Sequence, residues 1–167
     1  MTRSPRPLAA LRLVAPILAA LLLCPAPALA QQRPAAGLEP LGFLVGSWTA
    51  EGESADAGRF VEEYEIAWRH GGAFLQLEYS WKAADGRLLR TDTTVIGWDP
   101  IERRSVSFQF ASDGSIGRGA EAEAGKPDTW IWEGKAEGPA RSELSRFTLL
   151  RIDDGQFATR VEIRKTE

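Results

Sequence analysis

Turn-forming residues recur about every fourteen residues along most of this sequence. Glycine, proline, aspartate and histidine at these points supply a positive or fixed φ angle, or cap the backbone with a side chain. The turn positions are Gly58, 70–72, 85–86, 99–100, 113–114, 126–127, 138–139 and 154–155. Each interval leaves room for a strand of roughly eight to ten residues, which predicts a long antiparallel meander. An up-and-down barrel suits such strands because its closure removes exposed strand edges.

Alternating side chains within the intervals indicate which residues face inward. In 60–69, the aromatic and aliphatic residues lie on one face together with Glu62. The interval 75–81 alternates in the same way, and in 105–110 the alternation predicts that Phe108 faces the interior. A hairpin over 147–163 ends the sequence. These patterns predict half-buried strands with one apolar face.

One short helix is expected before the strands, because leucines recur at helical spacing over 38–46 and Pro40 stands in the first turn. With 47–53 as the first strand, the sequence contains about nine strands. The predicted fold class is therefore all-β, a single up-and-down antiparallel β-barrel of about 8–10 strands with a short N-terminal helix.

Residues 1–30 have the pattern of a cleaved secretory signal peptide. Three arginines precede an apolar run over 13–23, and a small-residue cleavage site ends at Ala30. The run is shorter than the about twenty residues of a membrane span, so no transmembrane anchor is expected. Cys24 follows leucine rather than a small residue, which favours cleavage over lipidation. The expected protein is periplasmic or secreted, with a flexible leader over 31–37 and one barrel domain over 38–167.

The composition of the remaining chain excludes several classes of function. Removal of residues 1–30 takes away three of the 20 basic residues and none of the 23 acidic ones, which leaves a formal net charge of −6. Nucleic acid is therefore not an expected partner. Only one histidine, His70, and no cysteine remain, and no regular acidic loop is present, so no metal site is predicted. A nucleophilic triad is not expected either, because no serine has the Gly-x-Ser-x-Gly context.

Glu62 is the most unusual candidate residue, since a carboxylate facing a barrel interior must be paired, hydrogen-bonded or protonated. Arg90 and Asp92 share a face of the strand predicted over 87–98, so the three could form an internal polar cluster. Glu62 could instead reach solvent at a strand end. The interior candidates for ligand binding are Glu62, Tyr64, Trp68, Arg90, Asp92 and Phe108.

A resemblance to known barrels rests on the element Gly46-x-Trp48 at the start of the first strand. It resembles the signature of lipocalins and other calycin barrels, and it follows a short helix as in that superfamily. With the segments 68–75, 96–100 and 150–155, the sequence is similar to secreted bacterial calycin-like domains of unknown function, and distantly to nitrobindin. The resemblance implies that Trp48 packs across the closed end of the barrel, under an arginine that would be Arg160 or Arg164.

Nitrobindin-like proteins bind haem, but this sequence departs from their motif. Alanine stands at position 50 where their pattern has glycine, and no histidine follows His70. The remaining axial donors would be His70, Tyr64 and Tyr79. We therefore expect no cofactor.

Six tryptophans, two tyrosines and seven phenylalanines could line an apolar cavity or fill the barrel completely. The preferred hypothesis is a secreted or periplasmic barrel that binds a small hydrophobic or aromatic ligand in its interior, without cofactor chemistry. One alternative is a cyclase-type or isomerase-type enzyme that uses Glu62, Tyr64, Arg90 or Asp92 to move a proton. The other is a filled barrel that serves as an envelope interaction module.

Overall fold

The computed structural model describes residues 34–54, 58–122, 126–139 and 141–165. The predicted signal peptide and the first leader residues lie outside these ranges. The described chain contains two short 3-10 helices, η1 (Glu39–Leu44) and η2 (His70–Gly72). Its strands are β1 (Gly46–Ser54), β2 (Gly58–Arg69), β3 (Phe74–Ala83), β4 (Leu88–Asp99), β5 (Arg104–Ala111), β6 (Ile116–Glu121), β7 (Thr129–Gly138), β8 (Arg141–Asp153) and β9 (Gln156–Lys165).

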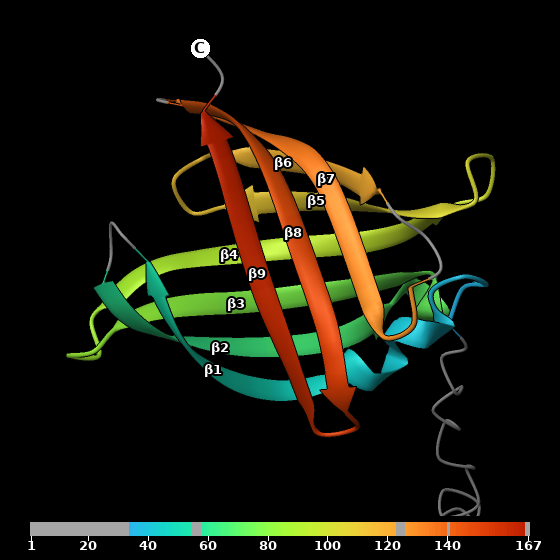
Figure 1. Ribbon diagram of the computed structural model, residues 1–167, viewed down its shortest axis with the longest axis horizontal. Coiled ribbons are helices and arrows are strands. Elements are labelled where there is room, and N and C mark those ends of the chain that lie inside the picture. Colours follow the sequence, from blue (N-terminus) through green and yellow to red (C-terminus); the bar gives the residue numbers. More distant parts are fainter. Residues whose placement is uncertain (1–33, 55–57, 123–125, 140, 166–167) are drawn as a thin grey trace, which may run out of the picture. The chain divides into compact units, whose positions relative to one another are not determined.

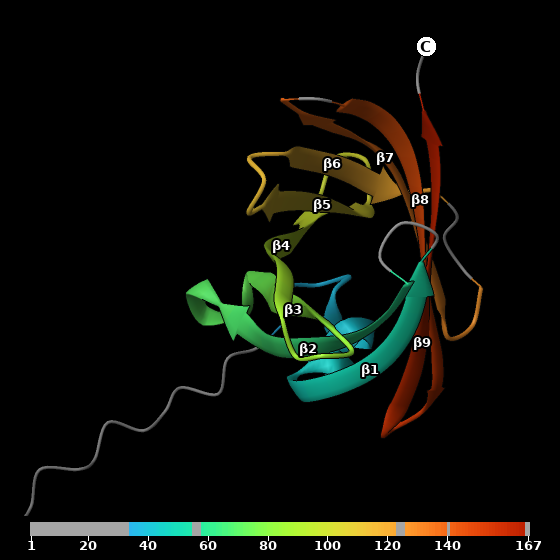
Figure 2. The same cartoon turned by 90° about the vertical axis from the view of Figure 1, so that its left-hand side faces the viewer.

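The strands form one antiparallel sheet in which each strand pairs with its neighbour in the sequence, in the order β1 to β9. The sheet curls into a half-barrel, so that β7, β8 and β9 cross in front of the first strands (Figures 1 and 2). The all-β fold, the number of strands and the short first helix are as predicted. Within the described residues, no helix is long and apolar enough to cross a membrane.

The turns lie where the glycine and aspartate signals place them. Gly86 and Gly114 have φ angles of 83° and 82°, in the left-handed region that glycine tolerates best. At the last turn, Asp153 accepts a hydrogen bond from the backbone N–H of Gly155 at 2.8 Å. Local turn chemistry therefore sets the strand boundaries.

The packed core occupies one end of the concave face, where η1 and its N-cap residue contribute three buried leucines. Leu38, Leu41 and Leu44 pack with buried inner-face residues that include Ile66, Leu75, Ile96 and Leu149. The predicted inward faces of β2 and β3 are confirmed, because their alternate aromatic and aliphatic residues form this core and the concave lining. The other end of the concave face is more polar.

Strand β5 has the opposite face assignment from the predicted one. Ser105 is buried on the concave side, where it accepts a hydrogen bond from Trp132 Nε1 at 2.8 Å, and Gln109 lines the same side. Phe108 and Phe110 lie on the convex face and are 38% and 49% exposed. The prediction that Phe108 faces the interior is therefore wrong, because the polar residues of β5 find hydrogen-bond partners inside.

Candidate functional site

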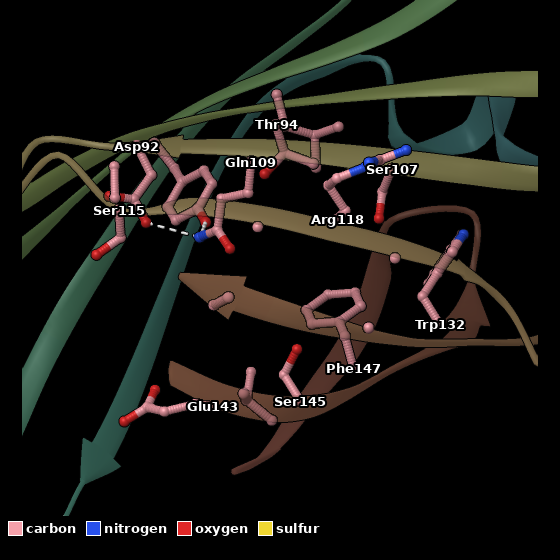
Figure 3. Close-up of a pocket in the computed structure, with 18 of the residues that line it drawn as sticks. Asp92, Thr94, Ser107, Gln109, Ser115, Arg118, Trp132, Glu143, Ser145 and Phe147 are labelled. Carbon is pink, nitrogen blue, oxygen red and sulfur yellow. Dashed lines mark hydrogen bonds between the residues drawn. The ribbon is translucent and has the colours of Figure 1, made fainter. Parts of the chain in front are cut away.

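A cavity of about 210 Å³ lies on the concave face of the sheet (Figure 3). Residues from every strand except β1 line it. In Figure 3, Asp92, Gln109 and Ser115 lie at one side of the cavity and Trp132 lies at the other. A concave space with apolar walls and a few polar groups is the usual form of a small-molecule site.

One wall of the cavity is aromatic. Tyr64 and Tyr79 stack with ring centroids 5.2 Å apart, and both line the cavity. Trp81 also lines it and stacks on Phe60 with parallel rings at 4.6 Å. Such offset contacts hold flat side chains in one orientation, so the wall presents fixed ring faces and edges.

Small residues predominate in the part of the cavity formed by β6 and β7. Gly117, Gly119, Gly134 and Ala136 line it together with Arg118 and Trp132. A Cβ atom on Gly134 would lie 2.0 Å from the carbonyl oxygen of Arg118, so only glycine fits the observed approach of the two strands. The glycines therefore allow the close approach of β6 and β7 that forms this side of the cavity.

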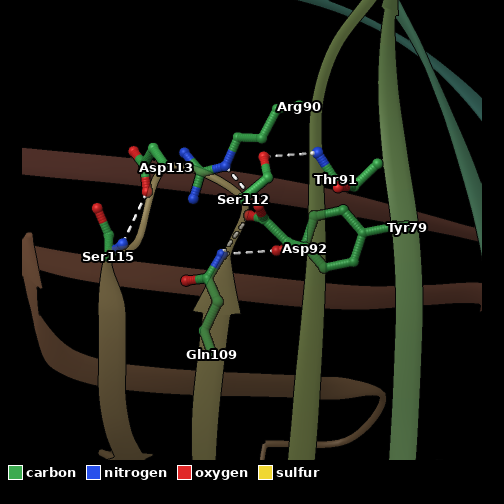
Figure 4. A network of polar contacts seen from close by, with 8 residues as sticks. All are labelled: Tyr79, Arg90, Thr91, Asp92, Gln109, Ser112, Asp113 and Ser115. Atoms are coloured by element: carbon green, nitrogen blue, oxygen red, sulfur yellow. Dashed lines mark hydrogen bonds and ion pairs between the residues drawn. The ribbon is translucent and has the colours of Figure 1, made fainter.

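A polar network crosses the cavity side of β3, β4 and β5 (Figure 4). Arg90 Nε donates to Asp92 Oδ1 at 2.6 Å, and the Asp92 side chain is only 1% exposed. Gln109 Nε2 donates to Asp92 Oδ2 at 2.8 Å and to the Tyr79 hydroxyl oxygen at 2.7 Å. Both oxygens of the buried carboxylate are thus satisfied, as a buried charge requires.

Two members of this network, Tyr79 and Arg90, have shifted pKa values. Burial raises the pKa of Tyr79 far above its ordinary value, and the negative charge of Asp92 raises it further. Partial burial acts to lower the pKa of Arg90, but the hydrogen bond and charge of Asp92 more than offset that effect and raise it. The tyrosine therefore stays neutral and the arginine stays charged at physiological pH.

Glu62 forms a separate pair with Tyr64. The Tyr64 hydroxyl donates to Glu62 Oε2 at 2.5 Å, and both side chains are buried on the inner face of β2. Burial raises the pKa of Glu62, although the hydrogen bond from Tyr64 opposes the shift. Burial also raises the pKa of Tyr64, and the charge of Glu62 adds to that effect. The predicted buried carboxylate is present, but its hydrogen bond is with Tyr64 rather than with Arg90.

Two buried polar atoms of the cavity lining have no hydrogen-bond partner among the described residues. They are Trp81 Nε1 and Ser115 Oγ. An unpaired buried donor costs about 1–3 kcal/mol, so such groups are rare in folded proteins and often mark sites that a ligand or water completes.

The structure brings together only part of the predicted site. Tyr64, Arg90 and Asp92 line the cavity. Glu62 and Trp68 lie on the inner face of β2 but are not among the lining residues. Phe108 lies on the convex face, where the Arg118 guanidinium carbon is 5.3 Å from its ring centroid.

The sequence did not predict that Gln109, Ser115 or the unpartnered Nε1 of Trp81 belongs to the site. The inward position of Trp81 follows from the alternation in β3, but its missing partner depends on neighbouring strands. Gln109 was missed because the alternation in β5 was assigned to the wrong faces. The signal that could have identified it is the series of polar residues Ser105, Ser107 and Gln109 at every second position.

The structural signature differs from the resemblance in one respect. Gly46 has a φ angle of 138° at the start of β1, and Trp48 Nε1 donates to the carbonyl oxygen of Leu44 at 2.7 Å. The ring of Trp48 packs edge-on against Phe157 at 4.8 Å. Arg160 does not cover it, because Arg160 is exposed and pairs with Glu162 at 2.8 Å.

A different arginine makes the cation–π contact near this end of the sheet. The guanidinium carbon of Arg151 lies 4.9 Å from the ring centroid of Phe43. The prediction for Arg160 is therefore wrong, since Arg160 lies on the convex face of β9 while the inward positions of that strand include Phe157.

His70 lies in η2 and is exposed, with its ring edge-on to Phe74 at 5.9 Å. Tyr64 and Tyr79 are already engaged in the hydrogen bonds described above. Within the described ranges, no group of three or more histidine, cysteine, aspartate or glutamate residues is arranged to hold a metal ion.

The sequence matches no protein-family model and no curated protein. The crystal structure of Rv2717c from M. tuberculosis is similar to this chain, with a TM-score of 0.51 and 19% sequence identity. The alignment covers 81% of this chain and 100% of that one. A similarity at this level of identity shows a shared fold, and it agrees with the curled antiparallel sheet.

Proposed function

We propose that this protein binds one small, flat, largely apolar molecule in the cavity on the concave face. The observation that carries the proposal is the pairing of an aromatic wall with a side built largely from glycine and alanine, across a space of about 210 Å³. An engineered apolar cavity of about 150 Å³ accepts benzene, so this space suits a substituted single ring.

The polar network would orient such a molecule. Arg90, Asp92 and Gln109 are fixed by mutual hydrogen bonds, so they can contact a ligand without first losing conformational freedom. Glu62 does not line the cavity, and for that reason the proposal does not extend to proton transfer by this residue.

The experiment is native mass spectrometry of the mature protein purified from its own host, compared with the denatured mass. A retained small-molecule mass is the expected result. The matched variants are Ala136→Leu, which fills the cavity, and Ala158→Leu, which adds the same side chain on the convex face of β9. We expect the first variant to lose the bound mass and the second to keep it.

The proposal fails if the protein carries no small molecule and a panel of flat aromatic compounds does not bind. It also fails if Ala136→Leu retains the ligand as well as Ala158→Leu does. One observation favours an interaction module as the second candidate, namely that Phe108, Phe110 and Ile116 are exposed on neighbouring strands of the convex face. An empty cavity would favour the interaction module, with this convex surface as its binding face.

We propose further that the protein acts after export. This proposal rests on the signal-peptide pattern of residues 1–30, which lie outside the described residues. N-terminal sequencing of the protein from its host should find Gln31 as the first residue, and an intact N-terminus would contradict export by this route.

A further inference from the structure

The two polar atoms without a hydrogen-bond partner among the described residues, Trp81 Nε1 and Ser115 Oγ, lie toward one end of the cavity. Trp81 pairs in register with Arg90 on the neighbouring strand. The next residue, Thr91, accepts a backbone hydrogen bond from Ser112 at 2.9 Å, and Ser112 belongs to the turn that leads to Ser115. Figure 4 shows Arg90, Ser112 and Ser115 in this one region. The two unpartnered groups therefore belong to the same polar end of the site.

Trp81 sets a chemical requirement, because an indole N–H can only donate a hydrogen bond. Other buried tryptophans of the chain meet this requirement within the protein. Trp48 Nε1 donates to Leu44 O at 2.7 Å, and Trp132 Nε1 donates to Ser105 Oγ at 2.8 Å. Trp81 Nε1 has no acceptor among the described residues. A molecule in the cavity that supplies an acceptor therefore removes the free-energy cost of this unpaired donor.

The charges around this end favour a neutral acceptor. Arg90 is already paired with Asp92 at 2.6 Å, and Asp113 also lies near its guanidinium (Figure 4). Arg118 also lines the cavity, but its guanidinium packs over Phe108 on the convex face. A carboxylate ligand would add another negative charge here, whereas a carbonyl oxygen accepts a hydrogen bond without one.

The shape of the cavity favours a planar ring. The stacked tyrosines present flat faces on one side, and Gly117, Gly119 and Gly134 present bare backbone on the other. A puckered ring of the same composition is thicker and fits such a slot less closely.

We propose, building on the binding function above, that the occupant is a neutral planar ring compound with a carbonyl oxygen that accepts the hydrogen bond of Trp81 Nε1. The hydroxyl of Ser115 is the second polar group at this end, and it can rotate to donate or accept. Quinones, aryl ketones and lactams are members of this chemical class.

The test uses the mature protein and four matched probes. Acetophenone has the planar ring and the neutral carbonyl. Ethylbenzene lacks the carbonyl, benzoate carries a charge, and cyclohexyl methyl ketone has a puckered ring. Binding is measured by calorimetry and by nuclear magnetic resonance of the tryptophan indole N–H groups, with the signal of Trp81 assigned through its loss in Trp81→Phe.

Acetophenone is expected to bind more tightly than the other three probes and to move the Trp81 indole proton downfield. The indole signal of Trp48, which does not line the cavity, serves as the internal control and should stay in place. Trp81→Phe replaces the indole with a smaller aromatic ring that has no N–H, so it should weaken acetophenone binding about tenfold more than ethylbenzene binding.

Several results would overturn this inference while the binding function stands. They are equal affinity for acetophenone and ethylbenzene, tighter binding of benzoate or of cyclohexyl methyl ketone, and an unmoved Trp81 signal at saturation. A retained native ligand without a carbonyl oxygen would overturn it too. If no probe binds and the protein from its host carries no small molecule, the inference and the proposed function both fail.

Discussion

Tyr64 donates its hydroxyl to Glu62 across a distance of 2.5 Å, on one face of a single strand and shielded from water. The two residues stand two positions apart in β2, so both point to the concave side. A buried carboxylate with one neutral donor is poorly compensated, and burial accordingly raises the pKa of Glu62 above its ordinary value of 4.5.

The first prediction concerns the pH dependence of stability. Because the folded-state pKa of Glu62 exceeds its unfolded value, the folded protein binds this proton more tightly, and stability falls as the pH rises through the folded pKa. In Glu62→Gln this loss is absent. Urea unfolding between about pH 4 and pH 8 should therefore show an advantage of the variant that grows with pH.

Glu63→Gln is the matched control for this experiment. Glu63 is the adjacent residue on the convex face, half-exposed and paired with Lys82 at 2.5 Å. Its substitution should produce no pH-dependent gain. An advantage of Glu62→Gln that shrinks toward high pH would contradict the assigned direction.

The second prediction concerns the ion pair of Arg90 and Asp92. Arg90→Met leaves a buried carboxylate without its charged partner, and it should lower the free energy of unfolding by about 3 kcal/mol. The double variant Arg90→Met/Asp92→Asn removes both charges together and should cost less than the single change. Urea unfolding of the full mutant cycle measures the coupling. A double variant less stable than Arg90→Met would argue against a buried, interdependent pair.

The third prediction concerns the close approach of β6 and β7. Gly134→Ala places a Cβ atom against the backbone of Arg118, and neither strand can yield without loss of pairing. We expect a loss of about 2 kcal/mol in the free energy of unfolding. Gly42→Ala is the control, since no atom lies within 4 Å of a Cβ at that position. Similar costs in thermal unfolding of the two variants would mean that the strands lie farther apart than described.

The fourth prediction tests the assignment of the two faces. Phe110 is exposed on the convex side, so Phe110→Ala should cost less than about 1 kcal/mol. Phe147 lines the cavity and packs against the core, so Phe147→Ala should cost about 3 kcal/mol. Thermal unfolding distinguishes the two, and a reversed order would restore the sequence-based assignment of β5.

The strand boundaries were predictable because glycine and aspartate specify turns through local geometry alone. The inward faces of β2 and β3 were predictable because aromatic residues occupy every second position there. In β5, the same two-residue alternation separates two faces but does not indicate which face lies on the concave side of the sheet. Ser105 and Gln109 face inward because their partners, Trp132 and Asp92, are there, and those partners come from other strands.

The candidate site was predictable only where one strand carries its members. Arg90 and Asp92 stand two positions apart in β4, and their ion pair follows from that spacing once their face is known. The cavity itself could not be predicted, since its volume depends on how closely β6 and β7 approach and on what stands opposite them. Arg160 was misassigned for a related reason, because the side of β9 that meets Trp48 depends on the curl of the sheet.

The small residues that line the cavity have a consequence for molecular selectivity. Ala111 and Ala136 line the cavity and already carry a Cβ. Larger side chains at these two positions would reduce the cavity volume stepwise, by one carbon atom at a time. Valine and then leucine at either position would reject progressively narrower rings while the backbone stays as it is. If the proposed binding function holds, the size of the accepted molecule can change through these two positions without a change in the strands that hold them.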